Sequence, residues 1–230
     1  MKASLVLALI ALAIPSAQAA PDLHWAFRYA SAEIGANGSV FQSTTLDQND
    51  PGVDAGMLNA QAVNQDIFAM AFGHLENSIA GSANGGIHVA INAFGDIAAQ
   101  NLPPYGSAYS FVDVYFQLDI HTDQAYRYAL GTTLYPASGI SGITQYDHFV
   151  AFNDPNGDSL LDADTTYTLY GRISYRLAES GGVYQAGYPG TTATLTLNPV
   201  PEPETWAMLL AGIGLVSLRL VRAPVNRIDF

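Results

Sequence analysis

Hydrophobic and polar residues alternate with a period of two along several parts of the chain, a pattern that is typical of β-strands with one buried face. The clearest alternation runs through residues 110–120. One side of this stretch carries Val112, Val114, Phe116, Leu118 and Ile120, and the other carries Phe111, Asp113, Tyr115, Gln117 and Asp119. Further strands are predicted over residues 24–30, 87–94, 126–134, 145–153, 167–177 and 191–197.

Turn signals separate these runs, as expected for a fold of many short strands. They are Asn37-Gly38, residues 84–86, Pro103-Pro104, residues 154–157 and Gly181-Gly182. Residues 58–80 fit either a helix or a strand, and a strand that leads into an 84–94 hairpin is the preferred prediction. The spacing favours one all-β domain over residues 20–199, built as an antiparallel β-sandwich or a jelly roll.

Residues 1–19 have the three parts of a secretory signal peptide. Lys2 supplies the positive start, and residues 5–14 form an apolar run. Pro15 then interrupts the helix, and Ala17-Gln18-Ala19 is the small-x-small pattern that precedes cleavage. This helix is therefore expected to be removed on export, which leaves residues 20–199 as the body of the mature protein.

A second apolar segment occupies residues 206–221. Its large apolar side chains are Trp206, Met208, Leu209, Leu210, Leu215 and Leu218. A helix of this length reaches about 24 Å, which is short for a hydrocarbon core of about 30 Å. Arg219 and Arg222 lie at its end, where arginine snorkels to the headgroups and stays on the cytoplasmic side. The segment is predicted to be a short membrane helix with the body of the protein in the periplasm.

An extended motif precedes this predicted helix. The motif comprises Val200, Pro201, Glu202, Pro203 and Thr205, and it runs into Trp206 and Ala207. Its two prolines hold the backbone extended and remove amide donors, so the segment is accessible to an enzyme that binds extended peptides. The order of motif (200–205), apolar helix (206–221) and tail (222–230) resembles the PEP-CTERM sorting signal, in the variant with Trp-Ala after the motif.

The resemblance implies an exported protein of a Gram-negative bacterium that is the substrate of an exosortase, an integral-membrane cysteine transpeptidase. Such a protein is held transiently in the inner membrane, is cut near the motif, and ends at the cell surface or outside the cell. Proteins with this signal are linked with exopolysaccharide and the biofilm matrix. The expected partners are therefore the exosortase, the inner membrane and an exopolysaccharide or cell-surface glycan.

The amino-acid composition excludes several kinds of chemistry and argues against one class of partner. Its 230 residues include 8 Lys and Arg, 20 Asp and Glu and no cysteine, and the formal net charge is −12. The absence of cysteine excludes disulfides, cysteine-ligated metals and a catalytic thiol. The acidity argues against a nucleic-acid partner, because binding to phosphates needs lysine and arginine.

One cluster of oxygen ligands is a candidate calcium site. It contains Asp154, Asn156, Asp158, Asp162 and Asp164. Alternating Asp and Asn residues supply the oxygens that Ca²⁺ prefers, but Gly157 and Thr165 do not stand where a regular calcium loop needs glycine and glutamate. A solvated turn between two strands explains the same residues and is the favoured interpretation. No other cofactor is predicted.

The remaining candidate chemistry is sparse. The histidines His24, His74, His88, His121 and His148 show no metal-binding spacing, and no nucleophile or phosphate-loop motif occurs. Asp147 and His148 are adjacent, so a strand would point them to opposite faces. Asp113, Tyr115 and Asp119 share one strand face, which suits a sugar-binding surface, but an ordinary exposed sheet face is the favoured interpretation.

These observations favour a non-enzymatic protein of the cell surface or extracellular matrix. A carbohydrate-binding module, with or without calcium, is the first alternative. A secreted hydrolase is the second, because paired carboxylates for glycoside hydrolysis are a property of the fold and not of sequence spacing.

Overall fold

The computed structural model describes residues 20–47, 56–64, 68–81, 85–100, 107–135, 142–179, 185–201, 207, 209–215 and 217. Statements about structure below refer to these residues. The predicted signal peptide of residues 1–19 lies outside them.

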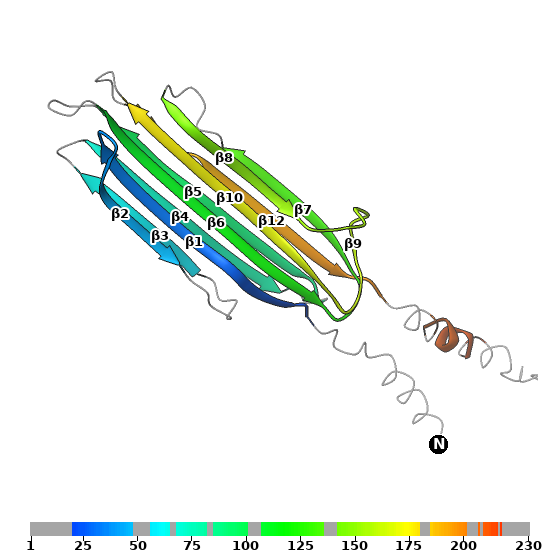
Figure 1. Ribbon diagram of the computed structural model, residues 1–230. Helices are drawn as coiled ribbons and strands as arrows, with labels where there is room; N and C mark the ends of the chain where they lie inside the picture. The colour runs from blue at the N-terminus through cyan, green and yellow to red at the C-terminus, as the bar shows by residue number, and fades with distance from the viewer. Residues whose placement is uncertain are drawn as a thin grey trace, which may run out of the picture.

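The described body is an all-β sandwich of two antiparallel sheets, as the alternation predicts (Figure 1). Sheet A has the order β2 (Ser39–Asp47), β1 (Asp22–Ala36), β6 (Ala108–Thr122), β10 (Thr165–Glu179) and β8 (Ile143–Phe152). Sheet B has the order β3 (Gly56–Asn64), β4 (Ala69–Gly81), β5 (Ile87–Ala99), β12 (Gly190–Pro199), β7 (Tyr126–Tyr135) and β9 (Leu160–Leu161), and β11 (Gln185–Gly187) pairs with β5.

The core lies between the two sheets and is supplied by the inward positions of each alternating strand. The central strand β6 contributes Val112, Val114, Phe116, Leu118 and Ile120, all fully buried. Opposite it, β5 contributes Val89, Ile91, Ala93 and Ile97. Burial of each large apolar side chain stabilises the fold by about 1.5–3 kcal/mol, so the sheet-to-sheet contact supplies most of the driving force for folding.

Two regions differ in detail from the sequence prediction. Residues 58–80 contain not one strand but two, β3 and β4, separated at Phe68, which has a positive φ of 46°. The short strands β9 and β11 and the strand β2 were not predicted, although the turn before β2 was. That turn uses Asn37 and Gly38 with φ of 52° and 78°, a left-handed pair that suits a tight hairpin. The predicted turns Pro103-Pro104 and Gly181-Gly182 lie outside the described residues.

A glycine in β10 allows the core to close over the central strand. A Cβ atom added at Gly171 would stand 2.6 Å from the Phe116 ring and 2.9 Å from the backbone oxygen of Phe149. Gly171 therefore leaves room for the Phe116 ring, and the neighbouring strand β8 can lie close beside it.

We expect Gly171→Ala to lower the free energy of unfolding by about 1–3 kcal/mol, because the backbone of β8 has to shift to admit the methyl group. Urea denaturation monitored by circular dichroism measures this change. Gly81→Ala is the matched control, since nothing lies within 4 Å of a Cβ atom there. Equal stability of the two variants would show that the sheet accommodates the extra methyl without strain.

Candidate functional site

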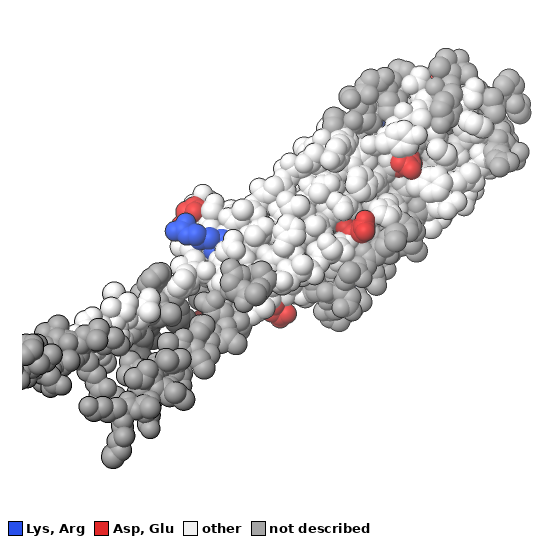
Figure 2. All heavy atoms as spheres, turned by 180° about the vertical axis from the view of Figure 1, so that it is seen from behind, with Lys and Arg blue, Asp and Glu red and all other residues white. Residues whose placement is uncertain are grey.

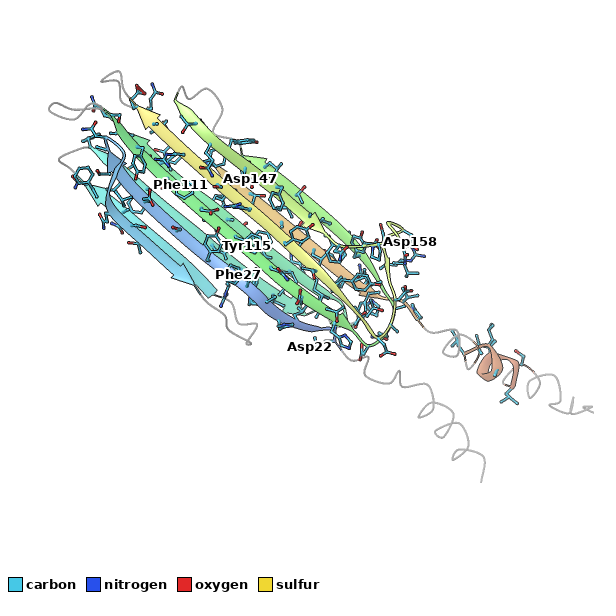
Figure 3. The ribbon with its side chains drawn as sticks, viewed as in Figure 1. Asp22, Phe27, Phe111, Tyr115, Asp147 and Asp158 are labelled. Atoms are coloured by element: carbon cyan, nitrogen blue, oxygen red, sulfur yellow. The ribbon has the colours of Figure 1, made fainter. Side chains whose placement is uncertain are left out.

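The outer face of sheet A carries a group of aromatic and charged side chains, which we call the aromatic face (Figure 3). Its members are Phe27 and Tyr29 from β1, Asp113, Tyr115 and Gln117 from β6, Tyr170 and Arg172 from β10, and Asp147 and Phe149 from β8. The strand register aligns them in rows across the sheet. One row joins Tyr29, Tyr115, Arg172 and Phe149, and the next joins Phe27, Gln117 and Tyr170.

The rings on this face contact one another across the strands. Tyr29 and Tyr115 stack with their centroids 6.0 Å apart and an interplanar angle of 23°. Phe27 lies 5.6 Å from Tyr29 and 5.8 Å from Tyr115, while Phe149 and Tyr170 meet edge to face at 6.1 Å. Such pairs restrict each other's rotation, so the rings are already ordered before any ligand arrives.

A charged network holds the centre of the aromatic face. The guanidinium of Arg172 donates from Nε and from an Nη to the two carboxylate oxygens of Asp113, each at 2.8 Å. The other Nη of Arg172 lies 3.5 Å from Asp147, and the Tyr29 hydroxyl donates to Asp113. The Asp113 side chain is only 10% exposed, whereas that of Asp147 is 44% exposed. Asp113 therefore orients Arg172 and Tyr29, and Asp147 is the carboxylate that the face presents to solvent.

Burial and hydrogen bonding raise the pKa values of two side chains in this network. Burial, followed by the hydrogen bond to Asp113, raises the pKa of Tyr29. The hydrogen bonds to Asp113 raise the pKa of Arg172 further above its already high value. Tyr29 thus stays a neutral hydroxyl donor and Arg172 stays a cation at all physiological pH values.

Asp119, which sequence reasoning placed with Asp113 and Tyr115, lies on the same face further along β6. It accepts a hydrogen bond from the Thr168 hydroxyl at 2.8 Å, and His24 Nε2 lies 3.9 Å from its other oxygen. Sequence reasoning did not place Tyr29, Arg172, Phe149 and Tyr170 on one face with Asp113. Their outward positions could be read from alternation, but the register that aligns them could not.

The candidate calcium loop lies between β8 and β10. Two of its carboxylates accept hydrogen bonds from nearby protein groups. Asp154 accepts from the Asn156 amide at 3.0 Å and from the Tyr128 hydroxyl at 2.9 Å, and Asp158 accepts from the Leu160 amide at 2.9 Å. These bonds are those of a capped turn. Among the described residues, no group of three or more His, Cys, Asp or Glu is placed to hold a metal ion.

Calcium binding by this loop remains a prediction that titration calorimetry can test. A binding heat at millimolar CaCl₂ that disappears in Asp158→Ala would support a site. Absence of heat in the unaltered protein would leave the loop with only its turn function. The favoured turn interpretation leads us to expect no heat.

Asp147 and His148 do lie on opposite faces of β8, as strand alternation requires. Asp147 lies beside Arg172 on the outer face, whereas His148 points inward and its Nδ1 is 3.0 Å from the Tyr175 hydroxyl. Burial lowers the pKa of His148, and its hydrogen bonding and the charge of Asp147 oppose this only in part.

The stability of the protein should therefore fall as the pH is lowered from 7 to 5. Because the pKa of His148 is lower in the folded state, the unfolded chain binds the proton more readily and gains in relative stability below its own pKa of about 6.5. Thermal unfolding at the two pH values measures the effect. His148→Gln should flatten the pH dependence. An unchanged slope in His148→Gln would contradict this assignment.

The predicted sorting segment begins directly where the sandwich ends. The amide of Val200 donates to the oxygen of Ala125 at 2.9 Å, and Pro201 is already exposed. Glu202, Pro203, Thr205, Trp206, Met208, Leu218, Arg219 and Arg222 lie outside the described residues. Ala207, residues 209–215 and Ser217 are helical.

The described part of this helix exposes its apolar side chains. Leu209, Leu210, Ile213 and Leu215 are 50–66% exposed, so the helix does not use them against the sandwich. Within the described part of the chain, no helix has the length and apolar character needed to cross a membrane.

Comparison with known proteins assigns the end of the chain. The family model of the PEP-CTERM protein-sorting motif matches residues 199–223. The search of curated proteins found no match. Among solved structures, envelope protein VP37 from White Spot Syndrome Virus is 9% identical, and the match covers 74% of this chain and 95% of that chain with a TM-score of 0.13, which carries no argument.

The chain therefore carries a PEP-CTERM sorting motif, as its sequence pattern predicts. The motif implies an exported protein that an exosortase processes as its substrate. It also implies delivery to the cell surface or the exterior.

Proposed function

We propose that this protein is a non-enzymatic component of the cell surface or extracellular matrix that associates with exopolysaccharide through the aromatic face. The sorting motif at residues 199–223 supports the destination, where polysaccharide is abundant. The aromatic face supports the interaction, because its rings and polar groups are ordered and lie on the outside of the sandwich.

The chemistry of the aromatic face suits a glycan. Sugar rings present apolar C–H faces that stack on aromatic side chains, and hydroxyl groups that bond to carboxylates and guanidinium groups. The row from Tyr29 to Phe149 crosses four strands, a width of about 14 Å, which accommodates several sugar rings of a chain. The net charge of −12 favours a neutral or cationic polysaccharide over a polyanionic one.

Before release, the precursor is held in the inner membrane by its C-terminal segment with the sandwich in the periplasm. The start of β1 and the end of β12 lie at the same end of the sandwich (Figure 1). The signal peptide and the sorting segment are therefore attached at one end, so both can reach one membrane while the long axis of the sandwich extends away from it. This arrangement leaves the aromatic face free along the length of sheet A.

Co-sedimentation of the exported protein with the exopolysaccharide of its own host tests the glycan proposal. We expect Tyr115→Ala and Tyr170→Ala each to weaken binding about five- to thirtyfold, because each loses a stacking surface worth on the order of 1–2 kcal/mol. Phe94→Ala is the matched control, since Phe94 is a 37%-exposed aromatic residue on the other sheet.

Circular dichroism is used to check that each variant is folded. Binding that is equal in all three variants, or absent in the unaltered protein, would contradict the role of the aromatic face. The control residue belongs to the other sheet. The side of the molecule opposite to the aromatic face shows few charged side chains among the described residues (Figure 2).

A further inference from the structure

Strand β8 is an edge strand whose outer side pairs with no strand in the described part of the chain. It extends over Ile143–Phe152 and is hydrogen-bonded to β10 on one side only. Beneath it lies β7 of sheet B, which pairs with β9 only through Tyr126 and Arg127 (Figure 1). The two strands together form one wall of the sandwich, which we call the β7–β8 edge.

The β7–β8 edge has few of the features that usually prevent edge strands from pairing: the described part of β8 shows one irregularity, at its start, where Arg176 pairs with Gln145 and Leu177 with Ile143. Residues 143–152 contain no proline and no lysine, and their one carboxylate, Asp147, is turned to the outer face beside Arg172. Residues 128–135 of β7 carry no charge at all. In a chain with a net charge of −12, β8 thus presents to a second copy a single carboxylate, Asp147, whose charge the neighbouring Arg172 offsets.

Large apolar side chains are exposed along the same wall. Tyr146 is 59% exposed and meets Tyr175 edge to face at 5.0 Å, while Leu134 and Tyr135 of β7 are 46% and 48% exposed. The opposite edge of the sandwich also exposes Val40 and Phe41, but a side-chain hydrogen bond joins its two strands. There the Gln42 side chain of β2 accepts a hydrogen bond from the Val63 amide of β3 at 3.0 Å, which ties the two edge strands together.

We propose that a second copy of this chain pairs with the first through β8, antiparallel, about a twofold axis normal to sheet A. A ten-residue strand is about 33 Å long, and a wall two sheets thick buries on the order of 1,000 Å² in total when two copies meet. This area reaches the lower limit of a stable interface. The backbone of β8 supplies the hydrogen bonds, and Tyr146, Leu134 and Tyr135 supply the apolar contact.

The dimer has a consequence for the aromatic face that does not depend on what that face binds. Antiparallel pairing of β8 with itself keeps equivalent side chains on the same side of the joined sheet. Sheet A becomes one continuous sheet of ten strands, twice the five in one copy, and both aromatic faces look outward together. Phe149 and Asp147 of each copy then lie beside the seam. A polymeric ligand would engage both copies at once, which raises its apparent affinity.

The natural lack of cysteine makes disulfide mapping a direct test. Single cysteines are placed at each of residues 144–151, and the exported protein recovered from its host is oxidised and separated on a non-reducing gel. Twofold pairing brings only the residue or the adjacent pair at the axis within disulfide distance of its own copy. Cross-linking should therefore peak at one or two neighbouring positions, and Ser78→Cys on the exposed face of β4 should not cross-link.

Sedimentation velocity of Thr144→Lys provides an independent measurement. Thr144 is exposed on β8, and a lysine buried there in each copy should weaken dimerisation at least about tenfold. Ser78→Lys adds the same charge away from the edge and should leave the dimer intact. A monomer at all concentrations, or uniform cross-linking along β8, would overturn the proposal. The proposal would also be overturned if cross-links formed only in double variants with one cysteine in β8 and one in β2. That result would indicate head-to-tail pairing, which produces open filaments.

Discussion

Replacing Pro201, Glu202 and Pro203 by alanine should abolish delivery of the mature protein to the surface or medium, and the precursor should accumulate in the inner-membrane fraction. The physical reason is local. The two prolines keep the segment extended and short of amide donors, and an exosortase has to bind the motif in an accessible form. Immunoblotting of membrane and extracellular fractions from a host that encodes the exosortase measures the loss, which we expect to be nearly complete.

The control for this experiment lies in the tail, beyond residue 223, where the sorting-motif match ends. Alanine at Pro224, Val225 and Asn226 also removes a proline and two neighbours, yet should leave export unchanged. Normal processing of the motif variant would show that the segment is not read as a sorting signal. Mass spectrometry of the mature C-terminus then locates the cut in the unaltered protein.

Arg172→Met should lower the free energy of unfolding by about 2–4 kcal/mol, because it leaves the Asp113 carboxylate with no cation in a site where its side chain is only 10% exposed. Arg172 itself is 35% exposed, so solvent screens part of the interaction and the loss lies below that of a fully buried pair. Urea denaturation measures the change, and Arg127→Met, at an exposed position on β7, should stay within about 0.5 kcal/mol of the unaltered protein.

A double-mutant cycle separates the ion pair from simple loss of packing. Asp113→Asn in the Arg172→Met background removes the stranded charge, so the double variant should be more stable than Arg172→Met alone. Strictly additive losses would contradict the interpretation that the two side chains act as a unit. The same variants bear on the glycan proposal, because Asp113 positions both Arg172 and Tyr29 on the aromatic face.

Much of the secondary structure could be predicted from local alternation. The inward and outward residues of β6 follow directly from a period of two, because successive side chains of a strand point to opposite faces. The same rule separates Asp147 from His148 on β8. The boundaries of β3 and β4 could not be predicted in this way, since residues 58–80 satisfy both helical and strand periods. The strands are stabilised by pairing, of β4 with β5 and of β3 with β4.

The aromatic face was only partly predictable. Asp113, Tyr115 and Asp119 share a face within one strand, so the sequence placed them together. Arg172 is 59 positions from Asp113, and Tyr29 is 84 positions from it. Their meeting depends on which strands are neighbours and in what register, and register is a property of the whole sheet.

What the sequence by itself determined is therefore everything that acts through a short stretch of chain: the sorting signal at residues 199–223, which a processing enzyme reads as a linear peptide, and the two faces of each alternating strand. What only the tertiary structure decided is which outward residues meet, that Asp113 is used internally while Asp147 is presented, and that β8 forms an open edge. The reason is physical. Periodicity is encoded between neighbouring residues, whereas strand order and register arise from the burial of one common core between two sheets.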